Sequence, residues 1–489
     1  MSKAFTNLSA SGEAASTSET TGRIVPADLK SKASTLRPVE TKTTHAVQIG
    51  VAPSHPSETR CPTGSRAPEL EVVSIGEMMA QKGKLRPTET RVTHELMVEE
   101  NMSDSKGTPT KPPEIMIPTD RLKATHAETH GSLGLRSWGA PWCTAASDED
   151  ARPGYATRKA NEYQDEPAVL SEKVALLASL IRKSRSCVVY SGAGISTSSG
   201  INDYATRASN SSAKADAPHL RSPFNASPTK SHRVLAALQK KGHLKYWIQQ
   251  NHDGLPQKAG YPQHLLNEIH GAWYDPSNPV VPMSGELRQD LFQDLLEWEG
   301  KADLCLSLGT SMCGMNADRV AISAASKAKK GNALGLVIVG LQQTQYDGES
   351  QLRIFAKLDD VFDLLSQELN LELSEGVYIP DVGPAAYDSS VFEVPYNSDG
   401  EQVTGEKSIL DLREDSRVKL TSGPHAGAFG EVVSRCREGH YRIRFNLLIK
   451  GKFRAPHQMK LGNWWVEAMV KGLVPNMPVV SVPRDDPGL

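Results

Sequence analysis

The sequence predicts an α/β protein with a doubly wound parallel sheet, followed by a small β-barrel near the C-terminus. Three observations carry this prediction. Short apolar segments alternate with helical segments from about residue 170 to 371, as parallel strands joined by helices do. Three of four polar motifs directly follow such a strand, where an open parallel sheet places its ligand. Beyond residue 413, short alternating strands are separated by glycines, which favours a small barrel.

The strands of the predicted sheet are short apolar runs bounded by turn residues, and the segments between them have helical spacing. This alternation favours parallel pairing, because each helix can return the chain to the same edge of the sheet. The expected strands span residues 187–190, 244–249, 265–269, 303–308 and 334–339.

The helices are indicated by apolar residues three and four positions apart. Ser231 is expected to cap the second helix and Gly242 to end it, Gly300 to end the third, and Asp359 or Asp360 to cap the last. The expected helices cover about 170–181, 232–241, 286–299, 316–330 and 361–369.

The composition excludes several classes of protein. The chain has 489 residues and a formal net charge of −2, so its overall charge indicates neither nucleic acid nor a membrane surface as a partner. It contains no run of the roughly 20 apolar residues that span a bilayer. Its six cysteines form no C-x-x-C pair. We therefore expect a reducing compartment, nuclear or cytoplasmic.

Changes in composition divide the chain into five parts. The first is rich in Ser, Thr and Pro and is expected to be mostly disordered, because it cannot bury enough apolar surface to offset chain entropy. A catalytic α/β domain, a linker, a basic barrel and a tail follow. The expected boundaries are 1–130, 131–372, 373–412, 413–465 and 466–489. Trp138, Trp142, Tyr155 and Tyr163 suggest that the stretch from about residue 131 packs on the core as an arm.

The first polar motif is a glycine turn directly after the strand at 187–190. Two glycines separated by one small residue allow backbone amides to approach a pyrophosphate, and a following helix would add positive potential. Taken alone, the turn is more often a packing feature than a nucleotide site. The motif consists of Gly192, Ala193, Gly194, Ile195 and Ser196.

Three further motifs supply polar side chains at other strand ends. Gln250, Asn251 and Asp253 can hold sugar hydroxyls or a carboxamide, although a plain polar turn explains them equally well. His270 can act as a general base near neutral pH, but a histidine in this position is more often structural. Gly309, Thr310 and Ser311 offer a phosphate or ribose contact, or an ordinary turn.

In order and content, these motifs resemble those of the sirtuins, the NAD-dependent protein deacylases. The resemblance covers about residues 170 to 371 and includes Glu268-Ile-His-Gly271 and Leu341. It implies a Rossmann-like domain that binds NAD, transfers an acyl group from a protein lysine to ADP-ribose and releases nicotinamide.

The resemblance also implies roles for single residues. Residues 192–196 would bind the NAD phosphates, and Gln250, Asn251 and Asp253 would orient the nicotinamide ribose and carboxamide. His270 would take a proton from a ribose hydroxyl. The remaining cofactor contacts would come from Asp203, Tyr204, Arg207, Gly309, Thr310, Ser311 and Leu341.

The chain departs from the sirtuin pattern at several places. The arginine after Asp203 and Tyr204 is displaced to Arg207, and Gly340 stands where the family often has an asparagine that contacts adenosine. Most sirtuins carry a zinc ribbon of two C-x-x-C pairs after the histidine, whereas here only Cys305 lies between His270 and Gly309. No zinc is therefore expected. The segments Val280-Val281 and Gly285-Glu286 resemble only faintly the strand that pairs with an acyl-lysine peptide.

The C-terminal region is basic, with 11 Lys and Arg against 4 Asp and Glu in residues 413–460. It resembles a KOW-type barrel and could bind RNA or a ribonucleoprotein, or dock a protein. Two alternatives to the deacylase stay open: an NAD-dependent ADP-ribosyltransferase or NAD hydrolase, and a non-catalytic adaptor that binds NAD or ADP-ribose.

Overall fold

The computed structural model describes residues 120–148, 150, 158–202, 218, 220, 222–282, 285–314, 316–449 and 453–483. The disorder expected for residues 1–130 falls almost entirely outside these ranges. None of the helices in the described ranges combines the length and the apolar character that crossing a bilayer requires.

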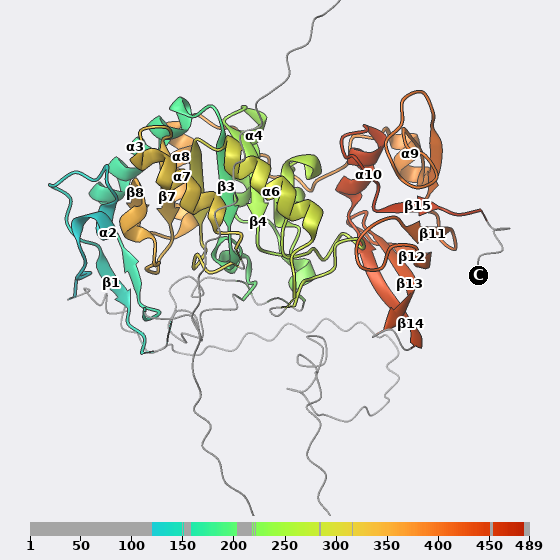
Figure 1. Ribbon diagram of the computed structural model, residues 1–489, viewed down its shortest axis with the longest axis horizontal. Helices are drawn as coiled ribbons and strands as arrows, with labels where there is room; N and C mark the ends of the chain where they lie inside the picture. The colour runs from blue at the N-terminus through green and yellow to red at the C-terminus, as the bar shows by residue number, and fades with distance from the viewer. Residues whose placement is uncertain are drawn as a thin grey trace, which may run out of the picture. The chain divides into compact units, whose positions relative to one another are not determined.

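The core of the α/β domain is a six-stranded parallel sheet (Figure 1). Its strand order is β5-β4-β3-β6-β7-β8, so the chain winds outward from β3 on one side and from β6 on the other. The predicted doubly wound parallel sheet is thus confirmed, and its topological switch point lies between β3 and β6. The strands are β3 Cys187–Ser191, β4 Leu244–Gln249, β5 Leu266–Glu268, β6 Leu304–Leu308, β7 Gly335–Val339 and β8 Leu352–Ile354.

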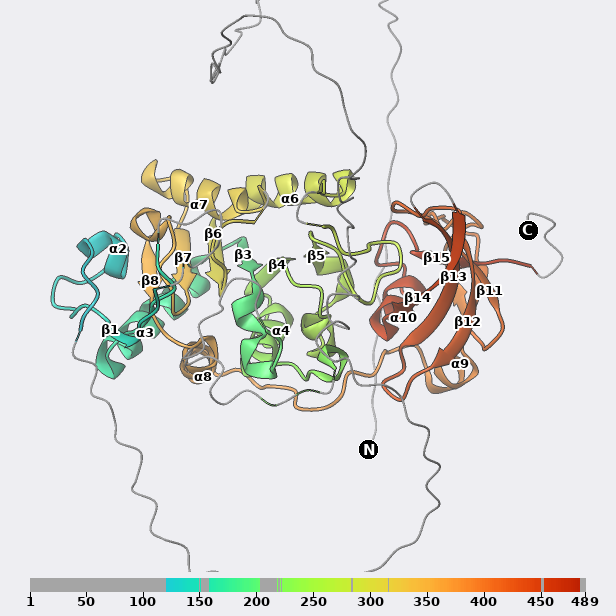
Figure 2. The ribbon, with the colours of Figure 1, turned by 90° about the horizontal axis from the view of Figure 1, so that it is seen from below.

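Helices cover both faces of this sheet (Figure 2). On one face α3, α4 and α8 enclose an apolar cluster with Val189 and Trp247 of the strands, both fully buried. On the other face α6 and α7 cover Val188 and Ile248, their neighbours in the strands. Because successive side chains of a strand point to opposite faces, each strand contributes residues to two separate apolar cores. The helices are α3 Pro167–Lys183, α4 Lys230–Lys240, α5 Leu255–Lys258, α6 Gln289–Lys301, α7 Arg319–Lys329 and α8 Leu358–Glu368.

The caps of α4 and α8 differ from those expected. Thr229 caps α4, its hydroxyl accepting from the His232 amide at 3.3 Å, whereas Ser231 lies within the helix. Lys357 precedes α8 without a side-chain cap. Asp359 lies in the first turn and instead accepts the Ser231 amide at 2.9 Å. The predicted capping serine and aspartate therefore join the two helices to each other.

Two further expectations were wrong in detail. α6 continues through Gly300 and ends at Lys301. The sheet has a sixth strand, β8, which the apolar pattern does not indicate because its central residue is Arg353. This side chain is fully buried and its Nε lies 2.9 Å from Asp347 Oδ1, so an ion pair occupies a position that an apolar residue would normally take.

The arm before the core packs against the outer strands. Trp138 and Tyr163 are buried, as expected, whereas Tyr155 lies outside the described residues. The Tyr163 amide donates to the Leu341 carbonyl at 2.8 Å, which ties the arm to the loop after β7. The arm contains α2 His126–His130 and the antiparallel pair β1 Trp142–Ala145 and β2 Glu162–Gln164.

Residues 384–481 form what we call the C-terminal module. Its main sheet is antiparallel with the order β14-β13-β12-β11-β15. Within the described residues the edge strands β14 and β15 do not pair with each other, so the sheet does not close into the expected barrel. Instead, α10 and the pair β9–β10 cover its apolar face. The elements are α9 Pro384–Ser389, β9 Val391–Val394, β10 Ser408–Asp411, β11 Arg417–Leu420, β12 Phe429–Arg435, β13 Tyr441–Ile449, β14 Phe453–Leu461, α10 Asn463–Val470 and β15 Val479–Ser481.

The module extends beyond the segment 413–465 expected for it. Phe392 and Leu410, in the segment expected to be a linker, are buried in its core. Val479 and Val480, in the segment expected to be a tail, belong to a strand that pairs with β11. Trp464 and Trp465 lie on α10 and are buried.

Candidate active site

The four polar motifs meet at one edge of the parallel sheet. Gly192 follows β3, Gln250 follows β4 and Gly309 follows β6, while His270 stands two positions after β5. All are carboxyl ends of parallel strands, so they lie at the same edge. The loops after β3 and β6 flank the topological switch point, where doubly wound sheets bind their ligands.

The two glycine loops pack directly against each other. The Gly194 amide donates to the Gly309 carbonyl at 2.8 Å. A Cβ on Gly194 would lie 2.8 Å from Gly309 Cα, and one on Gly192 would lie 2.8 Å from Thr310 Cβ. These glycines are therefore needed for the close approach of two backbones, whatever ligand the site takes.

The helix that we expected after the glycine turn is absent from the described residues. Two 3-10 turns follow instead, Ala193–Ile195 and Thr197–Ser199. Turns of this length do not accumulate the dipole of an α-helix, so the expected positive helix N-terminus does not contribute here. The amides of Gly192, Gly194, Ile195 and Ser196 donate to backbone carbonyls, so the Ala193 amide remains as a possible contact for a phosphate in this loop.

Ser196, Asn251 and Asp253 form a buried hydrogen-bond network between the first and second motifs. Ser196 Oγ donates to Asp253 Oδ2 at 2.7 Å and accepts from Asn251 Nδ2 at 3.0 Å. Asp253 Oδ1 accepts the Leu255 amide at 3.0 Å. Both carboxylate oxygens of Asp253 are thus engaged within the protein, so this residue fixes its neighbours. Asn251 donates to Ser196 through Nδ2, so its side-chain oxygen Oδ1 is the group that can accept from a ligand.

The fourth motif is joined to the second by a direct contact. Gln250 Nε2 donates to Thr310 Oγ1 at 2.7 Å, and the Met312 amide donates to the same hydroxyl at 3.1 Å. Thr310 and Ser311 are half-buried. The loops after β3, β4 and β6 therefore form one connected surface of amides, hydroxyls and carboxamides.

His270 lies in a loop that is tied to the Asn251–Asp253 loop. The Trp273 amide donates to the His252 carbonyl at 2.9 Å, and a ring nitrogen of His252 lies 2.8 Å from the Gly271 carbonyl. Because a carbonyl only accepts, this nitrogen, Nδ1, carries the proton. Burial lowers the pKa of His252, which keeps its ring neutral. His270 itself is half-buried, and its carbonyl accepts the Val281 amide at 2.9 Å.

A buried acid beneath this loop was not identified as functional from the sequence. Burial raises the pKa of Glu268 well above its usual range, and the charge of Asp275 raises it further. Burial therefore favours the protonated form of Glu268. The signal available in the sequence was a glutamate inside a short strand, two positions before the histidine.

The remaining predicted contacts are placed as follows. Asp203, Tyr204 and Arg207 lie outside the described residues, so their roles stay predictions. Leu341 is half-buried beside the arm. At Gly340 an added Cβ would have Gly309 as its nearest neighbour, at 3.9 Å, so a side chain would fit there.

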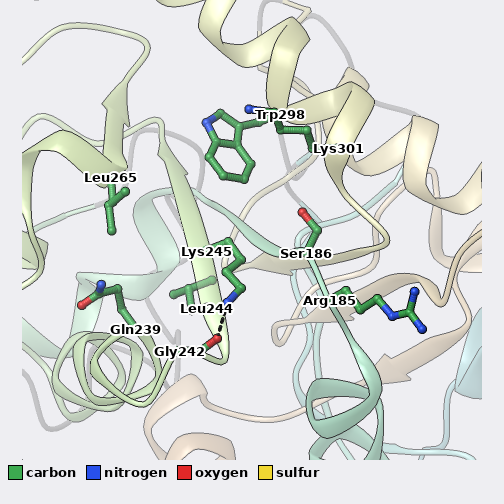
Figure 3. Close-up of a pocket in the computed structure, with 9 residues that line it drawn as sticks. All are labelled: Arg185, Ser186, Gln239, Gly242, Leu244, Lys245, Leu265, Trp298 and Lys301. Atoms are coloured by element: carbon green, nitrogen blue, oxygen red, sulfur yellow. Dashed lines mark hydrogen bonds between the residues drawn. The ribbon is translucent and has the colours of Figure 1, made fainter. Parts of the chain in front are cut away.

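A hollow of about 630 Å³ lies at the opposite edge of the sheet (Figure 3). It is lined by residues at the beginnings of β3 and β4 and the end of α6, among them Arg185, Lys245, Trp298 and Lys301. None of the four motifs reaches it, so it is separate from the candidate site. Among the described residues, no group of three or more His, Cys, Asp or Glu could hold a metal ion. The expectation that the protein needs no zinc stays a prediction.

Comparisons with known proteins agree with the motifs. The profile of the Sir2 family matches residues 207–277. The chain is 31% identical over 261 residues to the NAD-dependent protein deacetylase SRT1 of Arabidopsis thaliana, covering 45% of this chain and 54% of that protein. It is 28% identical to the NAD-dependent protein deacetylase Sirt6 of Drosophila melanogaster, covering 48% of this chain and 86% of that protein. It is 29% identical to the NAD-dependent protein deacetylase sirtuin-7 of Bos taurus, covering 44% of this chain and 64% of that protein.

The chain is also similar to several solved structures that are described as Sir2. One described as "Sir2-p53 peptide-NAD+" has a TM-score of 0.34 and 23% identity, covering 40% of this chain and 98% of that chain. The chain spans little more than half the length of the Arabidopsis relative. In its sequence matches and in the order of its motifs, this chain is similar to proteins of the Sir2 family.

Proposed function

We propose that the protein is an NAD-dependent protein-lysine deacylase with His270 as its general base. The observation that carries this proposal is the network of Ser196, Asn251 and Asp253, which joins two motifs at the sheet edge next to the histidine loop. A non-catalytic binder would need the polar network but would not need a base beside it.

The donor set at this edge suits a dinucleotide. In the loop after β3 the amides of Gly192, Gly194, Ile195 and Ser196 already donate to backbone carbonyls, which leaves the Ala193 amide to face a phosphate oxygen. The carbonyl oxygen of the Asn251 side chain can accept from a ribose hydroxyl or a carboxamide. Thr310 and Ser311 add hydroxyl groups on the other side of the switch point. NAD would supply an electrophilic ribose carbon with nicotinamide as its leaving group.

The protein's own residues would then orient the reactants and accept a proton. Asp253 and Ser196 hold Asn251 in one orientation, so the residue that meets the ligand is fixed before binding. His270 would accept the proton of a ribose hydroxyl, a task suited to an imidazole near neutral pH. Its loop is held by the two backbone and side-chain contacts of His252.

The test is nicotinamide release from NAD by the full chain, with and without peptides carrying acetyl or longer acyl groups on lysine. His270→Ala should lower peptide-dependent release by at least about 100-fold, the lower end of the range for a lost general base, while NAD still binds. His243→Ala, at the opposite edge of the sheet before β4, is the matched control and should keep its activity. Unchanged turnover in His270→Ala would refute the assignment.

The other outcomes of the same assay separate the alternatives. Release without any peptide would favour an NAD hydrolase, and transfer of labelled ADP-ribose to protein would favour an ADP-ribosyltransferase. Binding of NAD without release by the wild-type chain would favour an adaptor.

RNA binding by the C-terminal module and a nuclear or cytoplasmic location stay predictions. Arg442 and Arg444 are exposed on β13, although Arg444 is paired with Glu431 at 2.8 Å. Binding of an RNA oligomer that weakens steeply with salt would support the RNA prediction.

A further inference from the structure

The loop after His270 is part of the core of the C-terminal module. Tyr274, four positions after the histidine, is 2% exposed and belongs to the apolar cluster of that module. Its carbonyl accepts the Gly462 amide at 2.9 Å. Its ring centroid lies 5.1 Å from that of Trp464, in an edge-to-face arrangement. A strand end and helix α10 therefore hold the backbone that leads from His270.

The loop after Asp253 meets the same helix. Gly254 directly follows Asp253 and has a positive φ of 70°. A Cβ at this position would lie 2.9 Å from the Tyr274 ring and 3.0 Å from the Trp464 ring. Trp464 thus packs on both loops at once, the one that carries Asn251 and Asp253 and the one that follows His270.

Polar and backbone contacts surround this aromatic centre. Lys258, at the end of α5, lies 3.3 Å from Glu438 of the module and is largely buried. A Cβ on Gly423, in the turn after β11, would lie 1.8 Å from the Ser277 carbonyl oxygen. Only glycine permits that approach, so the module contacts the histidine loop at a second point.

This arrangement answers a question that the sequence raises. The resemblance to sirtuins implies a zinc ribbon after the histidine, and this chain has no C-x-x-C pair in that segment. The contacts of Tyr274, Gly254 and Lys258 all lead to the C-terminal module.

We propose that the C-terminal module positions the histidine side of the active site, with Tyr274 and Trp464 as the positioning residues. This inference rests on the proposed deacylase function, because it assigns the module an effect on that same reaction.

The test uses full-length Trp464→Ala and Trp464→Phe, with Val418→Ala as control. Val418 is fully buried in the module on β11, so its truncation also weakens the module's core without touching either loop. Trp464→Ala should lower kcat for peptide-dependent nicotinamide release by about 10- to 100-fold, as misplacement of a catalytic group does. KM for NAD should change less than kcat, and Trp464→Phe should recover most of the activity.

Amide hydrogen exchange gives a readout that does not need turnover. The Ala272, Trp273 and Val281 amides are hydrogen-bonded within or beside the histidine loop. Their exchange should accelerate in Trp464→Ala and stay close to wild type in Val418→Ala. If Trp464→Ala does not fold, Glu438→Gln, which removes only the half-exposed partner of Lys258, should show the same pattern with a smaller effect.

Equal losses of kcat in Trp464→Ala and Val418→Ala, or unchanged exchange in the histidine loop, would overturn the proposal. A wild-type chain that releases no nicotinamide would instead refute the deacylase function. In that case the exchange experiment alone still decides whether the module holds the loop.

Discussion

The two halves of the candidate site are supported from different parts of the chain. The nucleotide half, formed by the loops after β3 and β6, is held by contacts within the α/β domain: Gly194 against Gly309, and Gln250 against Thr310. The histidine half, formed by the loops after β4 and β5, packs on Trp464 of the C-terminal module.

The two kinds of support correspond to two different physical requirements, the approach of a backbone loop to phosphates and the exact placement of a general base. A loop that approaches phosphates needs little more than glycine and a strand end, so it can be built locally. A general base has to be held within a fraction of an ångström, which needs buried packing behind its loop. In this chain the loop that follows His270 packs on residues distant in sequence.

The largest effect is expected from breaking the nucleotide half with Gly194→Ala. The new methyl group would meet the Gly309 backbone at 2.8 Å on Cα and on the carbonyl oxygen, and neither can rotate away. Overpacking of this kind costs about 1–3 kcal/mol, so the dissociation constant for NAD should rise by about 10- to 100-fold. Calorimetry on the purified chain measures it.

Gly300→Ala is the matched control, since nothing lies within 4 Å of a Cβ at that position in α6. It should bind NAD as the wild type does and be as stable or slightly more so, because alanine favours a helix. Wild-type affinity in Gly194→Ala would show that the loops after β3 and β6 do not need their close contact.

Much of the nucleotide half could be predicted because its signals are local. Gly192, Gly194 and Gly309 stand at strand ends whose apolar runs are recognisable in the sequence, and the structure brings them to one edge. The support of the histidine half could not be predicted, because the contact of Tyr274 with Trp464 depends on how two distant segments pack. No periodicity in either segment encodes it.

The expected and observed folds differ where a contact between distant residues decides the local structure. β8 was missed because Arg353 interrupts its apolar pattern, and only the position of Asp347 makes a buried arginine tolerable there. The cap of α4 was assigned to Ser231 instead of Thr229, two hydroxyl residues that local sequence cannot distinguish. The barrel was expected from strand spacing, which does not specify whether the edge strands meet.

The next effect is expected from breaking the histidine half with Gly254→Ala. Alanine at a φ of 70° costs about 1–2 kcal/mol in the left-handed region, and its methyl group would also press on the Tyr274 and Trp464 rings. We expect kcat to fall by about tenfold and the dissociation constant for NAD to change less, because the contact between Gly194 and Gly309 is unaffected. Steady-state nicotinamide release and calorimetry measure the two separately.

Gly260→Ala is the control that separates the backbone strain of alanine at a positive φ from the contact of its methyl group with the module. Gly260 has a positive φ of 89°, but nothing lies within 4 Å of a Cβ there. It should lose stability without the loss of kcat. If Gly254→Ala and Gly260→Ala lose kcat equally, backbone strain explains the loss. The contact of Gly254 with the C-terminal module would then not support the histidine half.

A smaller effect, in the favourable direction, is expected from Gly340→Asn. The space at this position would accept a side chain, with its nearest neighbour at 3.9 Å from the Cβ. If the asparagine makes the adenosine contact that the family resemblance implies, one hydrogen bond of about 0.5–1.5 kcal/mol should lower the dissociation constant for NAD about two- to tenfold. Gly340→Ala controls for the added methyl group, and equal affinity in the two variants would exclude a hydrogen bond.

The smallest effect is a pH dependence at the junction of the two halves. The hydrogen bond from His440, together with the charge of Lys258, lowers the pKa of Glu438 to about 2. Because the folded pKa lies below the unfolded value of roughly 4.3, this carboxylate stabilises the fold above about pH 4.3. The contribution is lost as pH falls toward 2. Burial lowers the pKa of His440, so the ring donates its hydrogen bond while neutral.

Glu438→Gln should therefore be less stable than the wild type at pH 6, and the difference should shrink as the pH is lowered from about 4 toward 2. Thermal unfolding of both proteins across this range measures it. Because Glu438 is half-exposed, solvent and salt weaken the effect, so the comparison belongs at low ionic strength. A stability difference that stays constant down to pH 2 would show that the Glu438 carboxylate is not paired in the folded protein. The contact between Lys258 and the module would then not contribute to holding the histidine half.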